Sequence, residues 1–265
     1  MIINNNISSL NATNSLFKNE RNMNKSIEKL SSGLRINRAA DDAAGLAISE
    51  KMRSQIRGLD MAKRNTQDGI SLVQTAEGAM NEVHDMLQRL RELTVQGTNG
   101  IYTTADKANI KAEADELLAQ IDEVAEKANF NGVNLLDGSG DVELQIGVNA
   151  DDRITIGAVD VTTNTLGVNG LDIADTDSLA KLDKAIDTVS TERATLGATQ
   201  NRLEHTMNSI MNTHENLSAA ESRIRDVDMA KEMANFSKQQ VLLQAGMSIT
   251  AQANQKTSMV TQLLR

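Results

Sequence analysis

Apolar side chains between Leu179 and Ile224 recur in alternating steps of three and four residues. This spacing is typical of a long helix that packs along its length against other helices, as in a coiled coil. Four of the seam positions carry the polar residues Arg193, Gln200, His214 and Glu221. Such residues either fix the register and partner of a coiled coil or lie at the edge of a seam shared by several helices, and both explanations are open.

A second block of helical periodicity extends from about residue 42 to residue 95. Its apolar seam has the same spacing and consists of Val73, Ala76, Met80, Val83, Leu87 and Leu90. At about 1.5 Å per residue, a helix of this extent is roughly 80 Å long. After a break that contains Gly97 and Gly100, the pattern at residues 104–128 predicts a second helix that folds back on the first.

The chain contains no Pro, and aromatic residues make up only 2% of it. Because Pro interrupts helices more strongly than any other residue, its absence permits helices of this length. A thick globular core would lack its usual bulky side chains, whereas Ala, Leu, Ile, Val and Met pack well in thin seams between helices. The sequence therefore predicts a mainly α fold, built as a long antiparallel helical rod or coiled coil.

The segment at residues 131–176 differs from the helical blocks because it is rich in Gly, Asn, Asp and β-branched residues. Turn signals occur at Asn131-Gly132, Asp137-Gly138 and Asn169-Gly170. Alternation with a period of two residues appears at Val142, Leu144 and Ile146, and again at Ile154 and Ile156. A segment of this length predicts a few small β-hairpins rather than a substantial β domain.

Each end of the chain carries an apolar stripe with helical spacing that has no evident partner within its own segment. The stripes are Ile3, Ile7, Leu10 and Phe17 near the start, and Met233, Phe236, Leu243 and Met247 near the end. An amphipathic helix gains most of its stability from packing and is marginal in water when isolated. We expect the two stripes to pair with each other or with other copies of the chain.

Composition and motif content disfavour several classes of function. The formal net charge of −9 opposes general nucleic-acid binding, which requires a local excess of Lys and Arg. The chain has no Cys, and its three His show no metal-binding spacing, so we expect no metal, no other cofactor and no enzymatic activity. The sequence shows no pattern of a cleaved signal peptide or a membrane span, so no membrane insertion is expected.

Two charged clusters could suggest a catalytic or metal site, but each has a simpler structural explanation. The pair Asp41-Asp42 precedes a predicted helix, where a carboxylate accepts hydrogen bonds from free backbone N–H groups. The second cluster comprises Arg223, Arg225, Asp226 and Asp228. We expect its members to form ion pairs in solvent or between subunits.

Five segments of the chain resemble motifs of bacterial flagellins. The sequence EKLSSGLRINRAADDAAGLAIS at residues 28–49 is similar to the signature of that family, and QRLRELTVQ at residues 88–96 is similar to its helical core motif. Three more similar segments follow toward the C-terminus: LGATQNRLEH at 196–205, NLSAAESRIRDVDMAKEM at 216–233, and AQANQ before the closing LLR. The order of these segments is that of the family.

The resemblance implies a secreted subunit that self-assembles into the extracellular flagellar filament used for swimming motility. In this organisation residues 1–41 and 227–265 are the N-terminal and C-terminal inner-core segments. Residues 42–130 and 177–226 are the two halves of a helical rod, and residues 131–176 are a β-hairpin region in place of large outer domains. A hook–filament junction protein, which is also helical and similar to flagellin at its ends, is the alternative.

The resemblance also implies the partners of the chain. They are other copies of itself, a flagellar export chaperone, the export apparatus, the filament cap and hook-junction proteins, and the Toll-like receptor by which vertebrate hosts detect flagellin. The chaperone is expected to cover the C-terminal stripe of Met233, Phe236, Leu243 and Met247. Receptor binding is carried over to Arg89, Leu93 and Glu113, which we expect to converge on one surface of two neighbouring helices.

Overall fold

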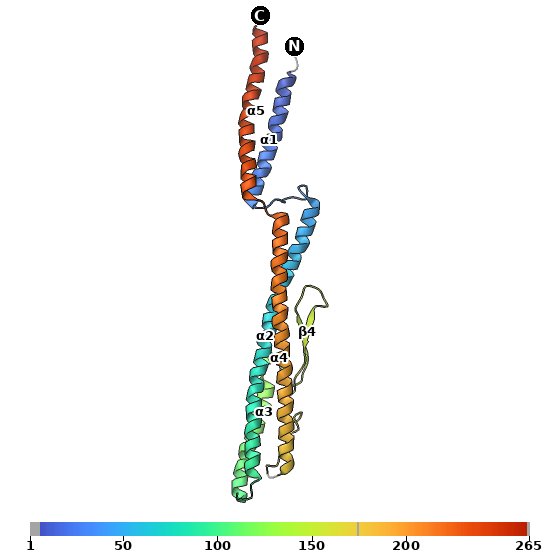
Figure 1. The fold of residues 1–265 in the computed structure, drawn as a ribbon, viewed down its shortest axis with the longest axis vertical. Coiled ribbons are helices and arrows are strands. Elements are labelled where there is room, and N and C mark those ends of the chain that lie inside the picture. The colour runs from blue at the N-terminus through green and yellow to red at the C-terminus, as the bar shows by residue number, and fades with distance from the viewer. Residues whose placement is uncertain (1–5, 174, 264–265) are drawn as a thin grey trace. The chain divides into compact units, whose positions relative to one another are not determined.

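The computed structural model describes residues 6–173 and 175–263, and most of these residues are helical (Figure 1). The helices are α1 (Ile7–Ser32), α2 (Ala43–Gly97), α3 (Thr104–Lys127), α4 (Thr176–Arg225) and α5 (Met229–Leu263). The predicted mainly α fold is confirmed. Helices α2 and α3 match the predicted helices at residues 42–95 and 104–128 to within two residues at each end.

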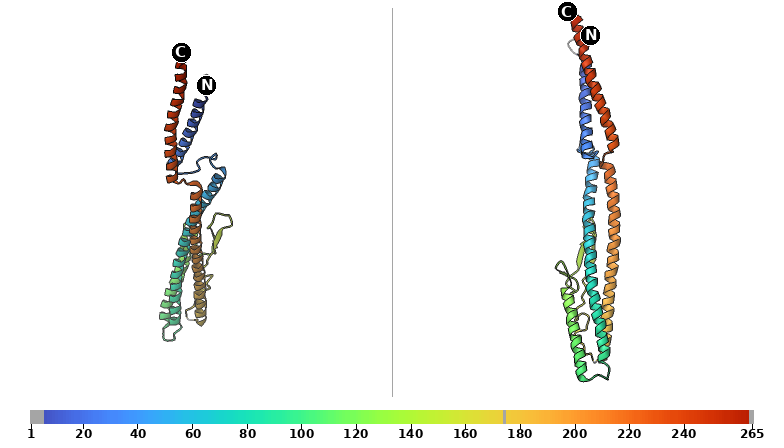
Figure 2. Two further views of the ribbon diagram at one scale, coloured as in Figure 1. Left: turned by 45° about the horizontal axis from the view of Figure 1, so that its top comes forward. Right: turned by 90° about the vertical axis from the view of Figure 1, so that its left-hand side faces the viewer.

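The chain forms two compact units, and helices α2 and α4 contribute residues to both. We call residues 55–215 the central unit, and residues 1–54 together with 216–265 the terminal unit. In the central unit α3 lies beside α2, and α4 lies along α2 on another side (Figure 2). The core of this unit is a thin seam between the helices, as the composition predicts.

The predicted α2 seam is buried, and the predicted α4 seam alternates between buried and half-buried positions. All six residues of the α2 seam from Val73 to Leu90 are at most 3% exposed. Helix α4 contributes Leu182, Val189, Leu196 and Leu203 at the spacing that the sequence indicates. Because these side chains interdigitate along the helices, the central unit has a continuous hydrophobic core.

Local hydrogen bonds fix the starts of two helices. The Asp42 carboxylate accepts a hydrogen bond of 2.8 Å from the backbone N–H of Gly45, so its predicted role as a helix cap is confirmed. Thr103 and Asp106 form a reciprocal capping box at the start of α3. The hydrogen bond from the Thr103 hydroxyl lowers the pKa of the Asp106 carboxyl below its usual value.

Two small antiparallel hairpins follow α3. Strand β1 (Asn129–Phe130) pairs with β2 (Val133–Asn134), and β3 (Val142–Gln145) pairs with β4 (Arg153–Ile156). The turn between β1 and β2 places both Asn131 and Gly132 at positive φ, which suits an Asn-Gly pair. The predicted short strands and this turn signal are confirmed.

The β3–β4 hairpin sits on a groove of small residues along α2. A Cβ atom at Gly69 would lie 2.3 Å from Leu144 Cδ1, and one at Gly58 would lie 3.0 Å from both Cγ atoms of Val148. Between these positions the Asn65 amide donates a 2.9 Å hydrogen bond to the carbonyl oxygen of Gln145. A Cβ atom at either glycine would therefore require Leu144 or Val148 to shift.

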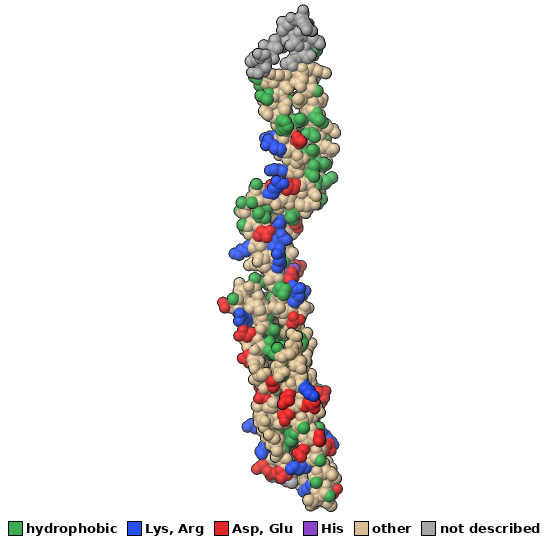
Figure 3. Space-filling view, turned by 180° about the vertical axis from the view of Figure 1, so that it is seen from behind, with side chains coloured by type: hydrophobic (Ala, Val, Ile, Leu, Met, Phe, Trp, Pro, Cys, Tyr) green, Lys and Arg blue, Asp and Glu red, His purple; other side chains and the backbone are tan. Residues whose placement is uncertain are grey.

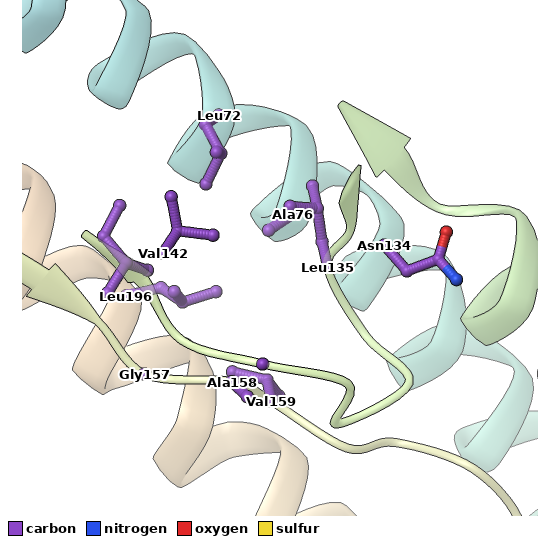
Figure 4. A pocket seen from close by; sticks show the side chains of 11 residues that line it. Leu72, Ala76, Asn134, Leu135, Val142, Gly157, Ala158, Val159 and Leu196 are labelled. Atoms are coloured by element: carbon purple, nitrogen blue, oxygen red, sulfur yellow. The ribbon is translucent and has the colours of Figure 1, made fainter. Parts of the chain in front are cut away.

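A cavity of about 10 Å³ lies where the hairpin region meets α2 and α4. Figure 4 shows Leu72 and Ala76 of α2 and Leu196 of α4 around it, with Val142 and Val159 from the hairpin region. This volume is about that needed for one water molecule, and most of the lining is apolar. The cavity is a packing gap and has no room for a small-molecule ligand.

In the terminal unit the segment after α1 pairs with the segment after α4, and we call this region the joint. The backbone N–H of Arg35 donates to the Arg225 carbonyl oxygen at 2.6 Å, and that of Val227 donates to the Gly33 carbonyl oxygen at 3.0 Å. The Arg35 Nε atom donates to the Ile224 carbonyl oxygen at 3.1 Å. The last turn of α4 is thus completed by residues from the other end of the chain.

The charged residues of the joint differ from the sequence expectation. Arg225 forms an ion pair with Glu50 of the same chain at 2.6 Å, and its side chain is only 13% exposed. Asp228 caps α5 by accepting a hydrogen bond from the N–H of Lys231. The prediction of solvated or intersubunit pairs is therefore wrong for Arg225, because the fold brings the start of α2 against the end of α4.

Candidate assembly interface

Helices α1 and α5 form an antiparallel pair, and the two described ends of the chain lie at the same end of it (Figure 1). The residues of α1 that face α5 recur at steps of three and four: Ser9, Ala12, Leu16, Asn19, Met23, Ser26 and Leu30. The corresponding positions of α5 are Glu232, Phe236, Gln239, Leu243, Gly246, Thr250 and Ala253. Most of this terminal seam is small or polar, which is unusual for a helix pair that must hold together in water.

Many large apolar side chains of the pair point away from the terminal seam, although Leu16, Met23, Leu30, Phe236 and Leu243 lie on it. Each of the following residues is at least 40% exposed: Ile7, Leu10, Phe17, Ile27, Met229, Met233, Val241, Leu242, Met247, Ile249 and Met259. Many of the green side chains in Figure 3 belong to this helix pair. The pair therefore exposes many large apolar side chains, whereas an ordinary soluble coiled coil buries most of them in its seam.

The predicted stripes at the chain ends divide between these two surfaces. Phe236 and Leu243 are half-buried on the terminal seam, so they face α1. Ile7, Leu10 and Phe17 of α1, and Met233 and Met247 of α5, are exposed. Ile3 lies outside the described residues. The structure thus pairs the two ends with each other and still leaves most of the predicted stripe residues uncovered.

Charge distribution also distinguishes the helix pair. Between Lys238 and Lys256 the sequence of α5 has no charged residue. The central unit, in contrast, has 27 Asp and Glu residues against 13 Lys and Arg residues, and red acidic side chains gather over it in Figure 3. Copies of the central unit repel one another electrostatically, whereas an uncharged apolar helix favours burial. The outer faces of α1 and α5 are the better candidate for an interface between copies.

Of the three predicted receptor residues, the structure exposes Arg89 and Glu113 and buries Leu93. Arg89 and Glu113 meet at the surface in an ion pair with an Nη2–Oε1 distance of 2.8 Å, and each side chain is about half exposed. The hydrogen bond with Glu113 raises the pKa of the Arg89 guanidinium further above its usual value. Leu93 is 1% exposed and belongs to the core. Arg89 and Glu113 therefore share a surface, and Leu93 lies behind it.

Sequence reasoning missed the polar contacts of the terminal seam. The Ser26 hydroxyl donates a 2.5 Å hydrogen bond to Glu232 Oε1, and Ser26 is buried. At the other end of the pair the Ser9 hydroxyl lies 2.7 Å from Asn254 Oδ1. The polar pairs Asn19 and Ser26 on α1, and Glu232 and Gln239 on α5, are each seven residues apart and could have indicated a polar seam, but the apolar stripe beside them is the stronger signal.

Two classes of site are absent from the described part of the chain. None of the described helices has a stretch long and apolar enough to cross a membrane. Among the same residues, no group of three or more His, Asp or Glu side chains is placed to hold a metal ion.

Comparison with known proteins assigns both ends of the chain to one family. Residues 3–141 match the bacterial flagellin N-terminal helical region, and residues 179–264 match the C-terminal helical region. Flagellins from Bacillus subtilis and Halalkalibacterium halodurans are each 50% identical, over 100% of both chains. The flagellar filament 33 kDa core protein of Treponema phagedenis is 47% identical over the same full coverage.

Solved structures agree with this assignment. The crystal structure of Bacillus cereus flagellin matches with a TM-score of 0.51 at 34% identity, covering 60% of this chain and 94% of that one. A putative flagellar hook-associated protein from Vibrio parahaemolyticus matches with a TM-score of 0.59 but at 11% identity, covering 70% of this chain and 100% of that one. The second match shows a shared fold only. From its matched helical regions and its full-length relatives, this chain belongs to the bacterial flagellin family.

Proposed function

We propose that the chain is a structural subunit that polymerises into the bacterial flagellar filament outside the cell. The observation that carries this proposal is the helix pair of α1 and α5, which exposes many large apolar side chains. Complete burial of one such side chain contributes about 1.5–3 kcal/mol, so a monomer leaves much stabilising free energy unused. Other copies expose the same apolar side chains, and the stretch of α5 between Lys238 and Lys256 is uncharged, so they are suited to cover these faces.

A hook–filament junction protein is the alternative function. The likeness to the Vibrio parahaemolyticus hook-associated protein, at 11% identity, supports only the shared fold. The full-length relatives of this chain are flagellins and filament core proteins, so the filament itself is the better supported location. The filament cap and the hook-junction proteins are then neighbours at the two ends of the polymer.

Substitution of outward apolar residues tests the proposed interface. The double variant Leu10→Ser, Met247→Ser is expected to elongate short filament seeds at least roughly tenfold more slowly than the wild type. Burial of one large apolar side chain contributes about 1.5–3 kcal/mol, and about 1.4 kcal/mol corresponds to a factor of ten. Elongation is measured by electron microscopy of filament length after mixing monomer with seeds.

A matched control comes from the central unit. Met211 of α4 is also exposed and helical, so Met211→Ser makes the same kind of change away from the proposed interface. It is expected to leave elongation unchanged. Equal rates for the control and the double variant would show that the outer faces of α1 and α5 do not drive assembly.

We also propose that a cytosolic export chaperone covers α5 before the chain passes through the flagellar export apparatus. Met233 and Met247 are exposed in the folded pair, and Phe236 and Leu243 become available when α1 is not in place. These surfaces would otherwise associate prematurely. Replacement of all four residues with Ser is expected to abolish binding of the cognate chaperone in pull-down and calorimetric titration. Unchanged affinity would place the binding site elsewhere.

Recognition of the monomer by the vertebrate Toll-like receptor for flagellin is a further part of the proposed function. Support comes from the exposed ion pair of Arg89 and Glu113, which presents an Arg of the kind that often lies at the centre of a binding hot spot. Leu93, in the core behind this pair, holds α2 in position.

Arg89→Ala is therefore expected to weaken receptor binding by roughly tenfold or more, as hot-spot truncation does. Surface plasmon resonance with the receptor ectodomain measures the change. Arg153→Ala provides the control, since Arg153 forms a similar exposed ion pair with Glu143 on the β3–β4 hairpin. Full binding by a folded Arg89→Ala variant would rule out this surface.

A further inference from the structure

The apolar residues of the terminal seam do not by themselves specify one register between α1 and α5. Leu16, Met23 and Leu30 are spaced at intervals of seven residues along α1. Phe236 and Leu243 are likewise seven residues apart on α5. A slip of α5 by seven residues, which is about 10 Å, returns an apolar residue to most apolar positions. Hydrophobic packing alone therefore accepts more than one register.

Two contacts of the seam do not repeat with this period. The buried Ser26 hydroxyl donates to Glu232 at 2.5 Å, and a Cβ atom on Gly246 would lie 2.9 Å from Leu16 Cδ1. Gln239 is seven residues from both Glu232 and Gly246. A slip of one heptad therefore brings Gln239 opposite either Ser26 or Leu16, replacing the carboxylate acceptor in one direction and filling the glycine gap in the other.

We infer that Ser26 and Glu232, supported by the close fit of Leu16 at Gly246, hold the register of α1 against α5 beyond the backbone hydrogen bonds of the joint. This inference rests on the proposed function, because the register decides which outward residues lie side by side on the pair. In one register Leu10 and Phe17 of α1 are fixed relative to the exposed methionines of α5. A slipped pair presents a different apolar surface to the next copy, so Ser26 and Glu232 are specificity-determining residues for assembly.

Buried polar residues at single seam positions are a known means of fixing the register of coiled coils, at some cost in stability. The composition of the terminal seam fits that role. The Gln239 Oε1 atom is buried and has no hydrogen-bond partner among the described residues, so this seam is not optimised for stability. Its polar positions select one alignment instead.

Engineered disulfides report the register directly, because the sequence contains no Cys. The pair Ser9→Cys, Asn254→Cys replaces two side chains that meet at 2.7 Å, so it reports the observed register. The pair Ser9→Cys, Met247→Cys reports a slip, since residue 247 takes the place of residue 254 after displacement by one heptad. Intramolecular disulfide yield is measured by gel mobility after mild oxidation, both in monomer and in seeded filaments.

Ser26→Ala and Glu232→Ala are each combined with the two cysteine pairs. Loss of a hydrogen bond to a charged group corresponds to roughly a tenfold change in the ratio of registers. We expect the 9–254 disulfide to decrease, the 9–247 disulfide to appear, and seeded elongation to slow by a similar factor. Glu232→Gln offers Ser26 the same amide that Gln239 offers after a slip, so it is expected to weaken the preference for the observed register as Glu232→Ala does.

The control is Ser15→Ala, which makes the same change at an exposed position of α1. It is expected to give the disulfide yields and the elongation rate of the wild type. Unchanged disulfide yields in Ser26→Ala and Glu232→Ala would overturn the register inference, whether or not the protein polymerises. Failure of the wild type and of Ser15→Ala to elongate seeds would instead overturn the proposed function, and the disulfide yields of the monomer would still decide the register.

Discussion

Chains that lack either terminal helix are expected not to elongate flagellar filament seeds at all. Removal of residues 1–32 deletes α1, and removal of residues 229–265 deletes α5. Each deletion removes half of the helix pair whose outward apolar faces we propose to be the interface between copies. Because many such side chains act together, the loss exceeds that of any point substitution. Electron microscopy of seeds incubated with each truncated chain measures the effect.

The central unit provides the internal control for these deletions. Its core is contributed by α2, α3, α4 and the hairpin region, all from residues 55–215. Circular dichroism of both truncated chains should therefore show a folded helical protein with cooperative thermal unfolding. Normal filament growth from either folded truncated chain would contradict assembly through the terminal pair.

Gly69→Ala and Gly78→Ala are expected to change the free energy of unfolding in opposite directions. Gly69 lies under the β3–β4 hairpin, where a Cβ atom would be 2.3 Å from Leu144 Cδ1, so overpacking should cost about 1–3 kcal/mol. Gly78 lies on the same helix with no heavy atom within 4 Å of its Cβ position. Alanine there should stabilise the helix by up to about 1 kcal/mol.

Urea unfolding of the monomer measures both values, and amide exchange locates the change. In Gly69→Ala the amides of β3 and β4 should exchange faster than in the wild type, because the hairpin no longer seats on α2. In Gly78→Ala they should be unaffected. Equal stabilisation by the two substitutions would show that Leu144 moves aside without cost and that the groove does not constrain the hairpin.

Much of the central unit could be predicted because its packing partners are encoded in the same chain. The spacing of Val73 to Leu90 identifies the buried side of α2, and Asn131-Gly132 identifies a turn, since both signals depend on local geometry. The burial of Leu93 could also have been predicted from the sequence. It follows Leu90 by three residues and so continues the buried seam, whereas its distance of four from Arg89 suggested a shared exposed surface.

The terminal unit was harder to predict for a physical reason. Sequence patterns reveal that Leu10 or Met247 must be buried, but they do not reveal whether the partner is the same chain or another copy. In the single chain the polar and small residues of the pair, such as Ser26 and Gly246, lie inside. Leu10 and Met247 lie outside, where under our proposal another copy covers them. The joint between Arg35 and Arg225 also has no local signal, since its partners are distant in the sequence.

Because of the joint, the two ends of the chain fold together only when both residues 33–35 and residues 224–227 are present. The Arg35 guanidinium bonds to a carbonyl of α4 that is 189 positions away, and the Gly33 carbonyl accepts from Val227. Contacts between residues so far apart in sequence form late in folding, because the intervening chain must first be present and ordered. A polypeptide that stops before residue 227 cannot finish the last turn of α4 or anchor the end of α1. Copies that terminate before residue 227 therefore lack the joint, and with it the folded terminal unit.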